Sequence, residues 1–281
     1  MSGPGGGAIG DWSTPWAGGP VGALARCVLA PNPGPLTLDG TNTWVLAAPG
    51  GRAVVVDPGP DDGAHLQHVL AVAQEGGRHV ALVLLTHGHA DHAEGARSLA
   101  ERAAAPVRAL DPACRLGEEG LAGGDVVAVD GLEVRVVATP GHTGDSLSFV
   151  LPADGALLTG DTVLGRGTSV VAHPEGRLGD YLDSLRRLQD ESAALGLRML
   201  LPGHGPALAD LPGVLTAYLA HRRARLAQVE AAVAAGRTSV EAVVASVYAD
   251  VDRALWPAAA LSVAAQLAYL GETPRPGTIL A

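Results

Sequence analysis

The chain has 281 residues and 47% of them are hydrophobic, which suits one large domain or a domain of about 200 residues with a smaller one beside it. A net charge of −10 argues against a broadly basic surface for nucleic acid. The two cysteines, Cys27 and Cys114, cannot build a disulfide framework, and a reducing cytoplasm is the expected location.

The first twenty residues are rich in Gly and Pro and contain Trp12 and Trp16. They lack the basic start and the continuous apolar segment of a signal peptide. We therefore expect residues 1–20 to form a flexible tail, whose tryptophans could dock on the body of the protein. No apolar run is long enough to cross a membrane without interruption, so no membrane partner is expected.

Short apolar runs separated by Gly and Pro dominate residues 21–212 and predict strands interrupted by helices. The predicted strands are Thr43–Ala47, Ala53–Val56, Val80–Leu85, Val107–Leu110, Val126–Val129, Leu132–Ala138, Leu147–Leu151, Ala156–Leu158 and Leu197–Leu201. The predicted helices are Asp62–Gln74, Ala93–Ala104 and Tyr181–Ala194. Because each sheet needs its apolar face covered, this order favours an α+β fold with sheets packed face to face and helices outside.

After Pro212 the short apolar runs give way to longer helical patterns, and residues 213–281 are expected to form a helical C-terminal domain. Its predicted helices are Gly213–Ala235, Ser239–Tyr248 and Ala258–Leu270. The last two are largely apolar and need a partner surface, which the sheets or a second subunit of a homodimer could provide.

Four segments with potential metal ligands each follow a predicted strand. They are Thr86-His87-Gly88-His89-Ala90-Asp91-His92, Thr139-Pro140-Gly141-His142-Thr143, Thr159-Gly160-Asp161-Thr162 and Leu201-Pro202-Gly203-His204-Gly205. Ligands at strand ends can converge on one rim of a sheet, and the small residues beside them allow close approach of the loops. Imidazole and carboxylate groups suit zinc and similar divalent ions. An isolated His142 or His204 would usually be a capping or surface residue, but the joint pattern indicates a metal centre.

The motif His87-x-His89-x-Asp91-His92, with His142, Asp161 and His204 downstream, resembles the metallo-β-lactamase superfamily in its glyoxalase II and ribonuclease Z-like branch. Further likeness to the lactamase-beta-like protein two family lies in the segments Asn32–Trp44, Gly160–Ser169 and Tyr218-x-x-His221-Arg222. The resemblance implies a four-layer αββα sandwich with the metals at one edge, followed by a winged-helix-like domain.

The resemblance also implies how the ligands divide between two divalent ions, most naturally zinc. One ion would take His87, His89 and His142, and the other Asp91, His92 and His204, with Asp161 bridging them. The best-known β-lactamases of this superfamily carry Cys where Asp161 stands, which weighs against antibiotic hydrolysis as the main role.

Two ions about 3.5–4 Å apart can hold a bridging hydroxide, because metal coordination lowers the pKa of water toward ~7. Asp91 is expected to orient this hydroxide as a catalytic residue. Asp57, which follows a strand, is a candidate acceptor for an N–H of a ligand histidine, with a turn cap as the equal alternative. We expect substrate contacts from Asn42, Arg166 and Thr168, although Asn42 could be a turn residue and Arg166 a solvated side chain.

The remaining histidines and a short run of basic residues are not expected to be metal ligands. His65 and His68 are three residues apart on a predicted helix, a spacing that could bind a metal, but they are interpreted as its surface. His79, His173 and His221 are expected to be structural or exposed, and the basic run Arg222, Arg223 and Arg225 to form a solvated face or, alternatively, to steer phosphate groups.

Three functions are compatible with these patterns. The leading one is a metal-dependent hydrolase of a small ester or thioester. The second is an endoribonuclease acting on single-stranded RNA. The third is a non-catalytic regulator that binds nucleic acid through a winged helix; it is disfavoured because Ala258–Leu270 contains no Arg or Lys to contact phosphates or bases.

Overall fold

Two mixed sheets pack face to face in the computed structural model, which describes residues 15–237 and 239–272. The first sheet has the order β1 (Gly19–Val21), β2 (Ala25–Leu29), β3 (Asn42–Leu46), β4 (Ala53–Val56), β5 (Val80–Leu84) and β6 (Val107–Arg108). The second has the order β11 (Met199–Pro202), β10 (Ala156–Gly160), β9 (Leu147–Leu151), β8 (Leu132–Ala138) and β7 (Val126–Val129).

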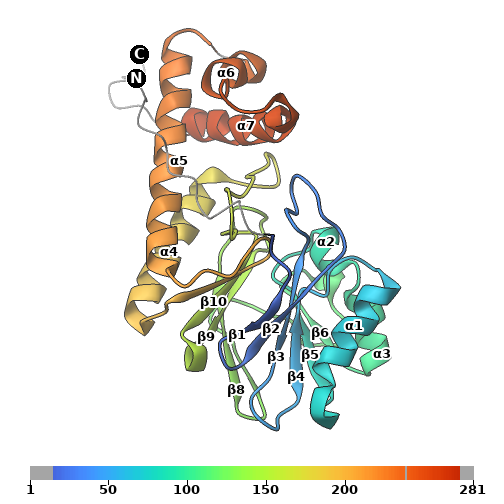
Figure 1. The fold of residues 1–281 in the computed structure, drawn as a ribbon. Coiled ribbons are helices and arrows are strands. Elements are labelled where there is room, and N and C mark those ends of the chain that lie inside the picture. Colours follow the sequence, from blue (N-terminus) through green and yellow to red (C-terminus); the bar gives the residue numbers. More distant parts are fainter. Residues whose placement is uncertain (1–14, 238, 273–281) are drawn as a thin grey trace.

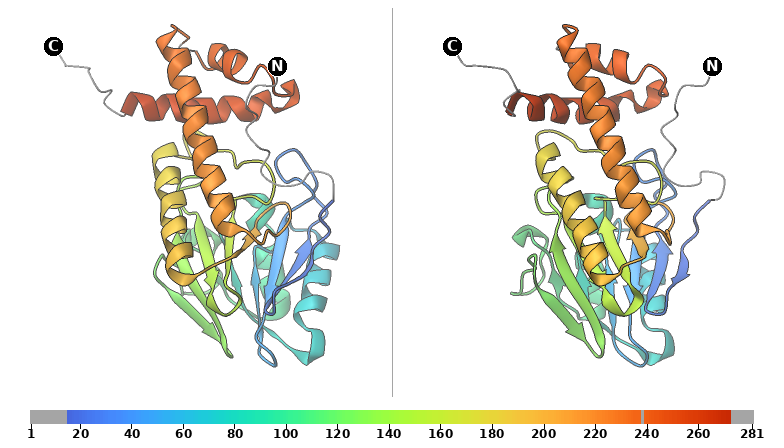
Figure 2. Two further views of the ribbon diagram at one scale, coloured as in Figure 1. Left: turned by 60° about the vertical axis from the view of Figure 1, so that its left-hand side comes forward. Right: turned by 90° about the vertical axis from the view of Figure 1, so that its left-hand side faces the viewer.

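Helices cover the outer face of each sheet (Figures 1 and 2). On the first sheet lie α1 (Gly63–Ala73), the single turn α2 (Ala90–Ala93) and α3 (Ala96–Ala103); on the second lie α4 (Leu178–Leu195) and the first half of α5 (Leu211–Ala234). Short 3-10 turns occupy Glu75–Gly77, Pro112–Cys114, Pro152–Asp154 and Arg253–Leu255. The predicted four-layer αββα sandwich is therefore confirmed.

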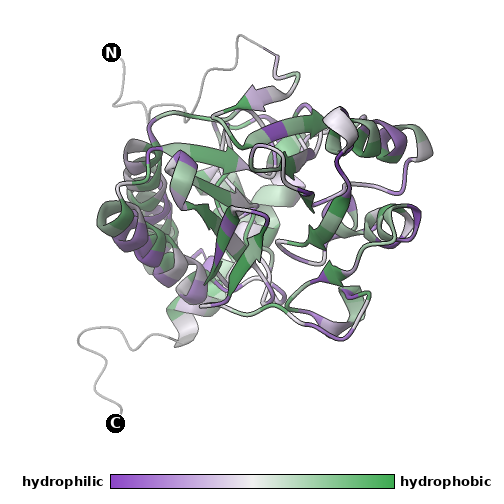
Figure 3. Cartoon of the chain, turned by 90° about the horizontal axis from the view of Figure 1, so that it is seen from below, coloured by the Kyte–Doolittle hydropathy of each residue, from purple (hydrophilic) through white to green (hydrophobic). Residues whose placement is uncertain are grey.

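The apolar core between the sheets is built from side chains that alternate along the strands. Trp44, Leu84, Phe149 and Leu158 are almost fully buried there. Seen from below, the strands are mostly green and the outer helices carry purple, hydrophilic stretches (Figure 3). Burying this much apolar surface at about 25 cal/mol per Å² is the main stabilisation of the sandwich, and it makes a rigid platform for the loops at its edge.

Parallel pairing brings the chemically important loops to one edge. Strand β4 pairs in parallel with β5, so Asp57 and His87 follow neighbouring strand ends. Strand β10 pairs in parallel with β11, which does the same for Asp161 and His204. Because parallel strands end on the same side of a sheet, each pair of residues is placed at one end of its own sheet, and the packing of the two sheets brings the pairs to a common rim.

Some predicted elements need correction. The sequence did not predict β1 and β2, although β2 pairs with β3 across its full length and shows the burial of a strand. The predicted helix Ala93–Ala104 is divided, because the N–H of Gly95 donates to Gly59 O instead of continuing the helix. A Cβ at Gly95 would meet Pro60 O at 2.9 Å, so this close crossing needs glycine.

The N-terminal segment is only partly described. Residues 15–20 lie on the sandwich, with β1 in the first sheet and the Trp16 indole donating to Asn42 Oδ1 at 2.8 Å. The expectation that Trp16 docks on the body is therefore confirmed. Trp12 and the rest of the predicted tail lie outside the described residues.

The C-terminal helices α5, α6 (Val240–Val247) and α7 (Trp256–Glu272) pack together around a small core that includes Val229, Val243 and Val263. The first half of α5 instead packs on the sandwich through Leu215 and Leu219, so α5 belongs to both clusters. By length and composition, Arg253–Gly271 could cross a membrane, which the sequence expectation did not foresee, but many core helices pass the same test.

Candidate metal centre

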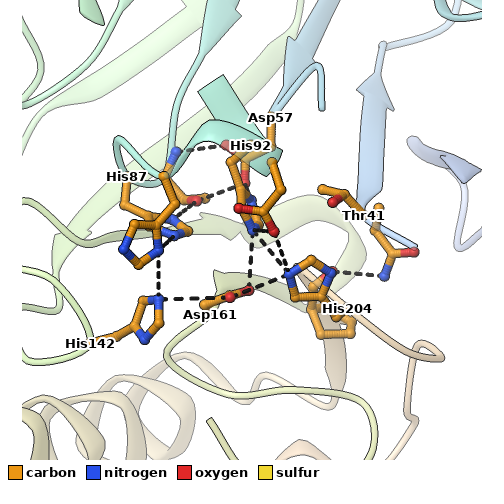
Figure 4. A network of polar contacts seen from close by, with 12 residues as sticks. Thr41, Asp57, His87, His92, His142, Asp161 and His204 are labelled. Carbon is orange, nitrogen blue, oxygen red and sulfur yellow. Dashed lines mark hydrogen bonds and ion pairs between the residues drawn. The ribbon is translucent and has the colours of Figure 1, made fainter. Parts of the chain in front are cut away.

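Seven His and Asp side chains converge at the rim where the sheets meet (Figure 4). His87 follows β5 and leads into the short turn α2, which carries Asp91 and His92. His89 directly precedes α2, and His142, Asp161 and His204 come from loops after β8, β10 and β11. All seven residues that the sequence singled out as ligands are brought together: His87, His89, Asp91, His92, His142, Asp161 and His204.

The first group consists of His87, His89 and His142. Nδ1 of His89 lies 3.0 Å from Nε2 of His87 and 3.1 Å from Nε2 of His142. Three ring nitrogens from three directions thus face a common point. Such close nitrogen atoms repel one another through their lone pairs unless a proton or a cation lies between them.

The second group consists of Asp91, His92 and His204. Nε2 of His204 lies 3.2 Å from both Nε2 of His92 and Oδ2 of Asp91. His92 and His204 are almost completely buried, whereas the Asp91 side chain is 32% exposed. Asp91 is therefore the ligand of this group that faces the solvent side of the centre.

Asp161 lies between the two groups. Its Oδ1 is 3.3 Å from Nε2 of His92, and its Oδ2 is 3.3 Å from Nε2 of His204 and 3.7 Å from Nε2 of His142. One carboxylate therefore reaches donors of both groups. This placement is the one that a bridging ligand requires.

Two observations test whether this donor set fits metal ions. Oδ1 of Asp161 is buried without a hydrogen-bond partner, which is costly for a carboxylate unless a cation satisfies it. A Cβ at Gly203 would meet Asp161 Oδ1 at 2.5 Å and His92 Cε1 at 2.8 Å, so only glycine lets the His204 loop approach this closely. The residues present fit a metal centre of hard and borderline ions such as zinc.

The outward nitrogens of the ligand histidines have acceptors that fix their tautomers. His92 Nδ1 donates to Asp57 Oδ2 at 2.9 Å, and His87 Nδ1 donates to Thr86 Oγ1 at 3.0 Å. Because Thr86 Oγ1 itself donates to Asp57 Oδ2 at 2.6 Å, Asp57 orients two ligands. Backbone carbonyls serve two more, namely Val170 O for His142 Nδ1 and Gly40 O for His204 Nδ1. In these four histidines the Nε2 lone pair is thereby turned toward the centre, whereas His89 presents its Nδ1.

Electrostatics keep the carboxylate of Asp161 ionised. Burial alone would raise the pKa of Asp161, but the neighbouring His204 and His92 outweigh burial and hold this pKa well below its usual value. Burial, together with the neighbouring imidazoles, lowers the pKa of His87 well below its usual value. An ionised carboxylate and a neutral imidazole are the forms that bind metal ions. At His204, burial would lower the pKa, but Asp161 and Asp91 outweigh burial and raise this pKa to about 9, so a metal ion at the second group must displace a proton.

Two of the three residues expected to contact substrate make structural contacts. Asn42 is fully buried, and its amide nitrogen donates to Pro202 O and Gly205 O, at 2.9 and 2.8 Å. Arg166 is 5% exposed and pairs with Asp39, so it ties two loops together and is not a solvated side chain. Sequence position near a ligand does not reveal the direction of a side chain, and contact of Asn42 and Arg166 with substrate stays a prediction. Thr168 is half-buried and stays a prediction.

Two further expectations of solvated side chains were wrong. His65 is buried, and its Nε2 lies 3.0 Å from Thr43 Oγ1 and 3.1 Å from Pro58 O, so it connects α1 to the first sheet. Arg222 is buried against Ser169 O instead of lying on a solvated face. Arg223 is exposed, as expected.

Several residues at the centre were not predicted. Thr86 adjoins a ligand in the sequence, and that adjacency was an available signal. Glu175 approaches Nε2 of His89 at 3.5 Å from a distant loop, which no local pattern indicates. Gly40 and Val170 act through backbone carbonyls, so their side-chain types carry no signal.

Two sheets between helices, with His and Asp ligands at their common edge, define a class of metal-dependent hydrolases. Residues 36–204 match the model of the metallo-beta-lactamase superfamily, and residues 239–272 match that of the beta-lactamase associated winged helix domain. Since the first match covers more than half of the chain, the protein belongs to the metallo-beta-lactamase superfamily.

Similar proteins agree with this assignment. The chain is 35% identical over 216 residues to the lactamase-like protein adaB of Aspergillus niger, a match that covers 76% of this chain and 65% of that relative. It is 33% identical over 209 residues to the beta-lactamase-like protein 2 homolog of Caenorhabditis elegans, covering 70% and 67%. A beta-lactamase domain protein from Burkholderia ambifaria has the same fold, with a TM-score of 0.76 at 24% identity over 94% of this chain and 92% of that one.

Proposed function

We propose that the protein is a hydrolase with two zinc ions that acts on a small ester or thioester. The observation that carries the proposal is the placement of Asp161 between two groups of ligands, with its oxygens 3.3 Å from Nε2 of His92 and of His204 in one group and 3.7 Å from Nε2 of His142 in the other. Bound divalent ions would supply a water of lowered pKa, toward ~7, and a Lewis acid for the carbonyl oxygen of the substrate.

The protein's own residues have separable tasks in this reaction. Asp91 is the partly exposed carboxylate, so it is placed to accept a hydrogen bond from the attacking water and to orient it. Asp161 holds the two groups of ligands at a constant separation. Asp57 and Thr86 keep the Nε2 atoms of His92 and His87 turned inward, so no ligand must reorient during turnover.

The charge distribution supports a small substrate over a polynucleotide. The net charge is −10, and α7 carries no Arg or Lys. Neutralisation of phosphates dominates nucleic-acid affinity, and this chain offers little for it. A pocket of about 270 Å³ lies between residues 173–180, which include the first turn of α4, and Ala265, Ala268 and Tyr269 of α7, but none of the seven ligands lines it.

The test combines metal analysis with a panel of substrates. Gently purified protein is expected to hold about two zinc ions per chain and to hydrolyse acyl thioesters and aryl esters faster than lactams or a single-stranded RNA oligonucleotide. The Asp161→Asn variant should lose this activity, and the exposed Gln67→Ala variant on α1 should keep it. RNA cleavage without ester or thioester hydrolysis would establish the endoribonuclease alternative, and a stoichiometry that never exceeds one ion would reject the two-ion centre.

A further inference from the structure

Helix α5 reaches from the C-terminal helices to the loop 161–170, which begins with the bridging ligand Asp161. Tyr218 and Arg222 lie one turn apart on α5 and are both buried. The Tyr218 hydroxyl accepts a hydrogen bond from Leu164 N at 2.7 Å. Arg222 donates from Nη2 to Ser169 O, at the far end of the same loop.

A second helix supports the Arg222 side chain. Its guanidinium carbon lies 4.9 Å from the centre of the Tyr181 ring of α4, and the Tyr181 hydroxyl donates to Thr162 O at 2.6 Å. The buried positive charge therefore has a carbonyl oxygen and an aromatic face beside it. Because the Arg222 guanidinium is held against the Tyr181 ring, its hydrogen bond to Ser169 O holds the backbone of the loop at Ser169.

The peptide that Arg222 holds adjoins the one that orients a metal ligand. Val170 O accepts the Nδ1 proton of His142 at 2.8 Å, and Ser169 Oγ lies 3.3 Å from the same nitrogen. Ser169 O and Val170 O belong to successive peptide units joined at the Cα of Val170, so a contact that holds Ser169 O limits how far Val170 O can move. His142 can direct Nε2 toward His89 only while Nδ1 keeps this acceptor.

We propose that Arg222 is a positioning residue for the first group of ligands, acting through Ser169 and Val170 on His142. The other four histidines have different outer partners: Thr86 for His87, Asp57 for His92, Gly40 O for His204 and Glu175, at 3.5 Å, for His89. The effect of Arg222 is therefore selective for the ion of the first group. The inference rests on the metal centre of the proposed function and not on its substrate.

The experiment is a titration of metal-free protein with zinc in competition with a chromophoric chelator, which resolves the two binding constants. Arg222→Met, which keeps the aliphatic stem, is expected to lower the affinity for one zinc ion by about tenfold and to leave the affinity for the other unchanged. A loss of about tenfold is the lower end of what is lost when the outer hydrogen bonds of metal ligands are removed. Arg222→Lys keeps the charge and should give a smaller loss. Arg223→Met, at the exposed neighbouring position, is the matched control and should bind both ions as the wild type does.

The site affected is identified in a His142→Ala background. There the first group is already incomplete, so adding Arg222→Met should leave the affinity for the remaining ion unchanged. An equal loss for both ions, or a further loss in the His142→Ala background, would overturn the proposal, as would wild-type affinities in Arg222→Met. If Arg222→Met does not fold, as judged by thermal unfolding, the same titration of Arg222→Lys decides. Because the readout is metal affinity, it remains valid even if no ester or thioester is hydrolysed.

Discussion

Asp57 accepts a hydrogen bond from His92 Nδ1 at 2.9 Å and also from Thr86 N and Thr86 Oγ1, at 2.8 and 2.6 Å. One buried carboxylate after β4 thus connects the first sheet to ligands of both groups. Its backbone φ of 49° lies in the left-handed region, which Asp and Asn tolerate better than most residues. Asp57 is therefore suited to this position both by its charge and by its backbone conformation.

Replacing Asp57 by Asn separates these two properties. Asn keeps the size and tolerates the backbone conformation, but its amide nitrogen cannot accept the proton of His92 Nδ1. We expect zinc affinity to fall by about 10–100-fold, mainly for the group of Asp91, His92 and His204. Chelator competition measures this change, and thermal unfolding of the metal-free protein measures separately the stability lost because the buried amide N–H faces the donors that Asp57 accepted from. Wild-type affinity in Asp57→Asn would show that the contact does not orient the ligand.

Removing the bridging carboxylate should abolish turnover while the fold survives. In Asp161→Ala the mutual repulsion of two cations is less compensated, so we expect fewer than two ions per chain and no measurable hydrolysis. Circular dichroism and thermal unfolding without metal serve as the control for folding, because Asp161 contributes little apolar packing. Wild-type turnover of any established substrate by Asp161→Ala would refute the bridging role.

Asn42→Ala tests the structural role of Asn42 against the expected substrate contact. The substitution leaves Gly205 O, next to His204, and the Trp16 indole without their partner, whereas Pro202 O keeps the hydrogen bond from the Trp44 indole at 3.0 Å. We expect a loss of about 3 kcal/mol in the free energy of unfolding, since each buried polar group left unsatisfied costs about 1–3 kcal/mol. Urea denaturation measures it, with the exposed Gln67→Ala as the control. A change in KM without a change in stability would instead support the substrate contact.

His221 should make the protein sensitive to mild acid. Burial, and then the charges of Arg222 and Arg225, lower the pKa of His221 to about 4, whereas an imidazole in the unfolded chain titrates near ~6.5. Between these values the unfolded state takes up a proton and the folded state does not. The contribution to stability is therefore complete above about pH 6.5 and is lost as the pH falls toward 4.

The expected result is that His221→Gln loses less stability than the wild type between pH 7 and pH 4.5. Urea denaturation of metal-free protein at several pH values gives the comparison, so that metal release does not contribute. His68→Gln, at an exposed position on α1, should follow the wild-type curve. Parallel curves for His221→Gln and wild type would contradict the assignment.

The ligand set was accessible from sequence because metal binding imposes residue types at particular places. Each ligand segment follows an apolar strand and is flanked by small residues, and parallel strands must end at one edge whatever the details of packing. The family resemblance, the αββα sandwich and the helical C-terminal region could be predicted for the same reason: they depend on local pattern and chain order. The ligand set is thus a property of the sequence.

The tertiary structure decided which polar residues are buried and what they hold. Asn42, His65, Arg166 and Arg222 are polar side chains that look solvated or substrate-facing in sequence, yet each is buried by an element distant along the chain. Burial of a polar group is favourable only when partners meet it, and those partners are largely backbone carbonyls, whose positions are independent of residue type. The contact from Arg222 to the loop beside His142 follows from the packing of α5 on the sandwich, which only the folded chain determines.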